Sequence, residues 1–104
     1  MIYLYFSEAA QLELDEAFAY FEEQQSGLGY RFTSDVDEAL ARIRSQPLAW
    51  HPLSKHLRRC HLRHFRYGLI YRIRGEQAEI FQGDLPIALL RHLINYPNGI
   101  IPKI

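Results

Sequence analysis

Residues 58–74 carry the pattern that most constrains the fold. From residue 67 onward, every second position is apolar or aromatic: Tyr67, Leu69, Tyr71 and Ile73. The alternate positions are Gly68, Ile70, Arg72 and Arg74. A period of two is typical of a strand that buries one face. The segment before it alternates less cleanly, and together the two halves predict a hairpin of two strands.

This hairpin is rich in arginine, at Arg58, Arg59, Arg63, Arg66, Arg72 and Arg74. An unpaired, buried guanidinium is very costly, so we expect these side chains to point away from the core. The hairpin would then present a basic, solvent-facing surface that is backed by an apolar one.

The net charge of zero hides a strong asymmetry along the chain. Residues 1–41 hold nine acidic residues and one basic residue, whereas residues 42–74 hold nine basic residues and no acidic one. The basic half is suited to attract an acidic partner or a phosphate backbone. The alternative is that the two halves pair their charges at the surface, where single ion pairs contribute little.

The order of predicted elements is strand, two helices and three strands. An unbroken apolar run at 2–6 favours a strand buried on both faces and central in its sheet. Helical spacing of apolar residues predicts helices at about 8–25 and 29–46, joined through a left-handed cap at Gly27 and ended by Pro47. The remaining strands are predicted at 58–64, 67–74 and 77–82, with a loop at 47–57. We therefore expect one α+β domain over residues 1–104, with an N-terminal β-α-α unit and the helical hairpin packed on one face of a four-stranded, mainly antiparallel sheet.

The residue composition indicates the cellular compartment of the protein and whether it binds a metal or cofactor. The only cysteine, Cys60, excludes an internal disulfide, fits a reducing cytoplasm and falls on the apolar side of its strand, as an inert core thiol would. No apolar run approaches the roughly 20 residues that span a bilayer, and the start lacks the basic region of a signal peptide. His61 and His64 are three apart on a predicted strand and so face opposite sides, which argues against a metal site. We expect a cytoplasmic protein with no membrane contact, no metal and no cofactor.

These features in this order resemble the ParE/RelE superfamily, the toxins of bacterial type II toxin–antitoxin pairs. The matching positions are the helix end at 24–29, the stripe Phe32, Val36, Leu40 and Ile43, and Pro47. The most specific part is the pair Arg58-Arg59, a short strand, Phe65-Arg66-Tyr67, and the strand Leu69-Ile70-Tyr71-Arg72. The resemblance covers residues 1–82.

Two positions distinguish the branches of this superfamily. The RelE branch cuts messenger RNA on the ribosome and commonly carries a basic residue after the tyrosine that opens the second hairpin strand, where this chain has Gly68. Near the C-terminus, His92-Leu93-Ile94-Asn95-Tyr96-Pro97 keeps the family spacing but places Asn95 where arginine is expected, and Phe81–Pro86 looks like an insertion or a bulge. His92 and Tyr96 are the candidate acid–base groups, with a core histidine and a packing tyrosine as the alternative.

The resemblance therefore favours a ParE-like toxin that binds DNA gyrase and is neutralised by a cognate antitoxin. The alternatives are a RelE-like endoribonuclease, whose partners are the ribosome and messenger RNA, and an inactive homologue that only binds the antitoxin. The predicted target-binding residues are Arg58, Arg59, Arg63, Arg72 and Arg74. The predicted antitoxin-binding residues, expected to leave apolar surface beside the helical hairpin, are Phe18, Phe21, Leu28 and Phe32. A toxin–antitoxin hetero-oligomer would follow.

Overall fold

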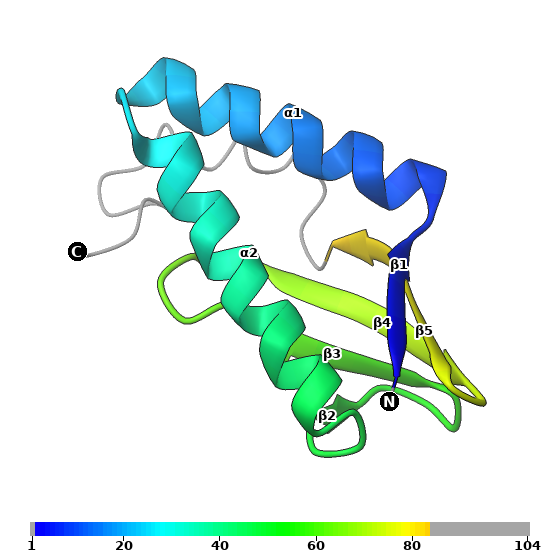
Figure 1. The fold of residues 1–104 in the computed structure, drawn as a ribbon. Coiled ribbons are helices and arrows are strands. Elements are labelled where there is room, and N and C mark those ends of the chain that lie inside the picture. The colour runs from blue at the N-terminus through cyan, green and yellow to red at the C-terminus, as the bar shows by residue number, and fades with distance from the viewer. Residues whose placement is uncertain (1, 84–104) are drawn as a thin grey trace.

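The computed structural model of the protein describes residues 2–83. Along the chain, its elements are β1 (Tyr3–Phe6), α1 (Glu8–Gln24), α2 (Leu28–Ser45), β2 (His51–Pro52), β3 (Leu57–His61), β4 (Gly68–Arg74) and β5 (Gln77–Gly83). Figure 1 shows the two helices joined by a short turn, with α2 crossing one side of the sheet. The predicted α+β class and the helical hairpin on one face are confirmed.

The sheet differs from the prediction of four mainly antiparallel strands. It has five strands in the order β1-β5-β4-β3-β2, and β1 pairs with β5 in parallel. The extra strand, β2, lies in the predicted loop, where His51 and Pro52 pair with Arg59 and Arg58. A two-residue strand is too short to leave a periodic signal, so sequence reasoning had no means to find it.

The prediction that the first strand is central and buried on both faces is wrong. β1 lies at the edge of the sheet, and its alternate side chains Tyr3 and Tyr5 are 62% and 42% exposed. Leu4 and Phe6 face the helices and pack against the core. The apolar run misled because tyrosine, with its hydroxyl group, is as compatible with a wet face as with a buried one.

The pairing of β4 with β5 contains an irregularity in the predicted region. Ile70 pairs with Gln82 and Tyr71 pairs with Ile80, so Phe81 is the extra residue of a β-bulge. The bulge expected from residue 81 onward is therefore present at its first residue. Residues 84–104 of the predicted single domain, including His92 and Tyr96, lie outside the described residues.

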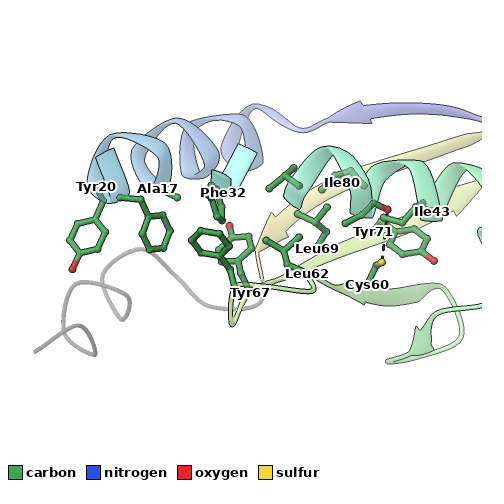
Figure 2. Close-up of a cluster of buried hydrophobic side chains, with 14 of the residues drawn as sticks. Ala17, Tyr20, Phe32, Ile43, Cys60, Leu62, Tyr67, Leu69, Tyr71 and Ile80 are labelled. Carbon is green, nitrogen blue, oxygen red and sulfur yellow. Dashed lines mark hydrogen bonds between the residues drawn. The ribbon is translucent and has the colours of Figure 1, made fainter. Parts of the chain in front are cut away.

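The core lies between the helices and the inner face of the sheet. It includes Phe21, Leu28, Phe32 and Ile43 from the helices, and Cys60, Leu69, Tyr71 and Ile80 from the strands. Figure 2 shows aromatic rings gathered at one end of this cluster and the Cys60 thiol directed at a helix. Phe32 contacts Phe21, Phe65 and Tyr67 with ring centroids 5.1–5.3 Å apart. Such tilted and edge-on ring pairs contribute beyond the area that they bury.

Both helices begin at identifiable caps. The Ser7 hydroxyl accepts a hydrogen bond from the Ala10 amide at 3.0 Å and donates to the Phe81 carbonyl at 3.2 Å, which ties the start of α1 to β5. Gly27 has a φ of 90°, as predicted for the turn between the helices. The Glu22 carboxylate accepts from the amides of Gly27 and Gly29, each at 2.9 Å, and so satisfies free donors at the start of α2. Within residues 2–83, no helix is long and apolar enough to cross a membrane.

Candidate functional site

The face of the sheet opposite the helices, here called the outer face, carries three of the five predicted target-binding arginines. Residues paired across a sheet share a face, and this places Tyr5, Glu79, Arg72 and Leu57 in one row across four strands. Tyr3, Gln77 and Arg74 form the row on one side of it. Ile70, Arg59 and His51 belong to a row on the other side. The outer face therefore combines Arg59, Arg72 and Arg74 with two exposed tyrosines.

The remaining two predicted arginines do not share this face, so the expectation of one basic surface is wrong. Arg58 pairs with Tyr71 on the inner side of the sheet, and its guanidinium donates to the Trp50 carbonyl at 2.9 Å. Arg63 follows β3 and forms an ion pair with Glu38 of α2 at 2.9 Å. Alternation along the strand separates Arg58 from Arg59, and a turn redirects the chain before Arg63.

The turn between β3 and β4 is held by a buried carboxylate. Asp35 of α2 is 3% exposed, and it accepts hydrogen bonds from the amides of Arg63, His64 and Phe65 at 3.4, 2.8 and 3.2 Å. Its Oδ1 also lies 3.2 Å from His64 Nδ1. These bonds fix the turn to the helix, and they satisfy a carboxylate that would otherwise be costly to bury.

Sequence reasoning missed the role of Asp35, although a signal was present. Asp35 lies three residues after Phe32 and four before Ala39, both of which are fully buried core residues. A carboxylate within the apolar stripe of a helix is buried on folding, and this costs much free energy unless the carboxylate accepts hydrogen bonds there. The spacing alone therefore marks it as a residue with a specific partner.

An apolar groove of about 500 Å³ runs between the helices, beside the end of β1. It is lined by Phe6, Leu14, Phe18, Phe32, Val36 and Leu40, with Gln11, Asp15, Thr33 and Asp37. Phe18 and Phe32, two of the four predicted antitoxin-binding residues, therefore line it. Its polar contributions include two carboxylates, so its charge is opposite to that of the arginine-rich hairpin.

The other two predicted antitoxin-binding residues lie elsewhere. Phe21 and Leu28 are each 1% exposed and belong to the core. The expectation that they leave apolar surface is wrong, and Phe32, also 1% exposed, offers only a little. The ring of Phe65, from the turn after β3, packs on Phe21 and Phe32 with ring centroids 5.0 and 5.2 Å away, and so helps to bury both rings.

Two titratable groups in the core hold their protons more firmly than usual. Burial raises the pKa of the Cys60 thiol, against smaller opposing effects of Arg42 and Arg63. Burial, followed by repulsion from Cys60, raises the pKa of Tyr71 to about 12. The Tyr71 hydroxyl donates to the Pro47 carbonyl at 2.6 Å. A protonated, fully buried thiol makes a poor nucleophile, so Cys60 has the properties of a core residue.

The segment between α2 and β3 is attached to the last turn of α2 through Trp50. Trp50 Nε1 donates to the Arg42 carbonyl at 3.2 Å, and the Arg42 guanidinium lies over the indole ring, 5.5 Å from its centroid.

Over residues 2–83, no group of three or more His, Cys, Asp or Glu side chains is arranged to bind a metal. His92 and Tyr96, the candidate acid–base groups, lie outside those residues.

Comparisons with known proteins agree with this fold. Residues 4–82 match the family described as the ParE toxin of the type II toxin–antitoxin system parDE. The chain is 32% identical over 93 residues to Toxin ParE2 of Mycobacterium tuberculosis, strains CDC 1551/Oshkosh and ATCC 25618/H37Rv, over 88% of this chain and 82% of the relative. A solved chain from the chromosomal ParDE TA system of P. aeruginosa superposes with a TM-score of 0.68 at 16% identity, covering 81% of this chain and 95% of that one.

The structural likeness supports the fold alone, because its sequence identity is low. The family match spans β1 through most of β5, and the sequence relative is aligned over most of both chains. The chain therefore belongs to the ParE family, the toxins of type II toxin–antitoxin systems.

Proposed function

We propose that this toxin inhibits DNA gyrase by binding to it, and that a cognate antitoxin neutralises it. The observation that carries the proposal is the family match over residues 4–82. The superfamily's other branch cleaves RNA and commonly has a basic side chain directly after the tyrosine that precedes the second hairpin strand. Here that position is Gly68, which is buried at the start of β4 and pairs with His61. The missing side chain favours binding over cleavage.

The outer face is the proposed contact surface for gyrase. Arg59 and Arg72 are partly exposed there and Arg74 is exposed, beside the exposed rings of Tyr3 and Tyr5. Arg72 donates to Glu79 at 3.0 Å, a bond that ties its guanidinium to the neighbouring strand β5. Arginine and tyrosine, together with tryptophan, are enriched among the residues that dominate binding at protein interfaces.

A pair of parallel assays tests the target. The purified toxin is titrated into a gyrase supercoiling reaction on relaxed plasmid, and separately into programmed ribosomes with messenger RNA. We expect loss of supercoiling and intact message. Cleaved message would establish the RelE-like alternative, and activity in neither assay, with retained antitoxin binding, would establish the inactive homologue.

A triple variant tests the surface. Arg59→Ala/Arg72→Ala/Arg74→Ala should raise the toxin concentration needed for half inhibition of gyrase at least tenfold. Arg31→Ala/Arg66→Ala is the matched control, because both side chains are exposed and neither belongs to the outer face. Equal inhibition by the two variants would exclude the outer face from the contact.

We further propose that an amphipathic helix of the antitoxin fills the groove between α1 and α2, giving a toxin–antitoxin hetero-oligomer in the cytoplasm. The groove offers Leu14, Phe18, Val36 and Leu40, at helical spacing on both of its walls. Phe18→Glu should abolish neutralisation when toxin and antitoxin are expressed together. Leu12→Glu, which is also on α1 but 60% exposed and outside the groove, should leave neutralisation intact.

A further inference from the structure

We propose that the segment from residue 46 to 56, together with Arg44, forms a second docking surface, here called the basic loop surface. It fits an acidic protein surface that contains an apolar pocket. The inference rests on the proposed function, because the partner that it describes is the protein target of the toxin. It adds a contact that neither the outer face nor the groove provides.

The basic loop surface presents Leu48 on a rigid support. Leu48 is 69% exposed, yet the residue before it and the second residue after it are both fixed. The Pro47 carbonyl accepts from the Tyr71 hydroxyl at 2.6 Å, and the Trp50 carbonyl accepts from the Arg58 guanidinium at 2.9 Å. A side chain held in place before binding loses little conformational freedom when a partner closes over it.

A second leucine follows after β2 on another hydrogen-bonded turn. Leu53 is 40% exposed, and the amides of Leu53 and Ser54 donate to the Leu57 carbonyl at 2.8 and 3.3 Å. Single exposed leucines are common on protein surfaces and need no function. Here two exposed leucines lie on one short segment whose backbone is held by hydrogen bonds. Such a pair is suited to enter apolar pockets on the surface of a partner.

The positive charge of this surface indicates a partner that carries carboxylates. The chain has no acidic residue from 39 to 75, and Arg44 and Lys55 are exposed at the end of α2 and in the loop. Carboxylates on a partner would be attracted to these cations during the encounter and held beside them in the complex. A phosphate backbone would meet the cations equally well, but it offers no pocket for Leu48 or Leu53.

The groove between the helices has the opposite character, because its polar lining includes Asp15 and Asp37. A partner that complements one surface therefore carries the wrong charge for the other. The antitoxin and the target would bind at separate places, and a variant of the basic loop surface should separate the two activities.

The test compares Leu48→Asp/Leu53→Asp with Leu12→Asp, a control that adds the same charge to an exposed leucine of α1. In the gyrase supercoiling assay, we expect the double variant to need at least tenfold more protein for half inhibition. The control should match the wild type. Both variants should bind and be neutralised by the antitoxin as the wild type is, which also shows that they are folded.

A charge reversal gives an independent measurement. Lys55→Glu leaves both leucines in place and should slow association with gyrase at low salt by about threefold or more, with little change at high salt, because exposed charges act over a Debye length of about 8 Å at physiological ionic strength. Wild-type inhibition of gyrase by the double leucine variant would overturn the inference while leaving the proposed function standing.

If the wild type does not inhibit gyrase, the proposed function fails, and growth arrest on induced expression becomes the readout. Growth arrest that is lost only in the double leucine variant supports the basic loop surface with a different protein target. Equal growth arrest by all variants overturns it, as does the absence of arrest by the wild type. Binding of a fluorescent single-stranded oligonucleotide that is weakened by Lys55→Glu and unaffected by the leucine variant would show a nucleic acid partner instead, and would also overturn it.

Discussion

The acidic stretch at residues 1–41 and the basic stretch at residues 42–74, which begins in the last turn of α2, use their charges differently. The engaged carboxylates of the helices bind mainly backbone amides. Asp35 holds the turn after β3, and Glu22 holds the start of α2. Arginines of the basic segment reach backbone carbonyls, as Arg42 does at His61 and Arg58 does at Trp50. Direct ion pairs between the two regions include Arg63–Glu38, which is largely exposed.

A chain of zero net charge can therefore have two surfaces of opposite sign, the groove between the helices and the basic loop surface. A carboxylate that binds backbone amides stabilises the fold without neutralising the positive charge of an arginine elsewhere. The carboxylates that bind amides are buried or partly buried, and exposed arginines of the basic segment, such as Arg66 and Arg74, can contact a partner. Four predictions test this division, from the largest expected effect to the smallest.

Removing the carboxylate of Asp35 should have the largest effect. Asp35→Ala leaves the amides of three consecutive residues without their acceptor, and we expect the free energy of unfolding to fall by about 4 kcal/mol. Urea denaturation followed by circular dichroism measures this. The control is Asp37→Ala on the same helix, whose side chain is exposed. Similar losses for both variants would show that the buried carboxylate does not differ from a surface one.

Alkaline pH should weaken the fold through Tyr71. Its pKa is about 12 in the folded protein, against 10.0 for an ordinary tyrosine. Between these values the unfolded chain releases a proton that the folded chain keeps, so stability falls as pH rises, by at most about 3 kcal/mol. The stability is fully present below pH 10. Tyr71→Phe should lose about 1 kcal/mol at neutral pH and show a smaller decline from pH 9 to 12. An identical decline in wild type and variant would contradict the assignment.

The close contact between the helices should not tolerate a methyl group at Gly29. A Cβ there would lie 2.7 Å from the Phe18 carbonyl oxygen and 3.0 Å from the Glu22 carboxylate that caps α2. We expect Gly29→Ala to lower the free energy of unfolding by about 2 kcal/mol, because overpacking displaces backbone and cap together. A thermal melt shows it. Ser34→Ala, at an exposed position of α2, should melt as the wild type does.

The exposed ion pair should matter least. Arg63→Ala removes a bond between side chains that are 61% and 41% exposed, and we expect a change of less than about 1 kcal/mol in the free energy of unfolding. The same urea titration measures it, and 0.5 M salt should reduce the difference further. A loss as large as that of Asp35→Ala would show that ion pairs between the two regions hold the fold together, contrary to the comparison.

The sequence determined both helices, every described strand except β2, and the fold class, because the signals for these are local. Apolar spacing located both helices, and alternation located β4 to within a residue. The positive φ of Gly27 and the end of α2 before Pro47 also followed from the residues alone. The family was recognisable for the same reason, since the ParE match covers the same ordered patterns.

Only the tertiary structure decided which residues of a pattern share a surface. Tyr5 and Arg59 are far apart in sequence, yet they share the outer face because β1, β5, β4 and β3 pair in that order. Phe21 is absent from the predicted binding surface because it is buried in the core, where Phe65 packs on it. The edge position of β1 likewise depends on its pairing with β5, far along the chain. Pairing between distant segments follows from the packing of the whole chain, whereas periodicity records only which side of an element is apolar.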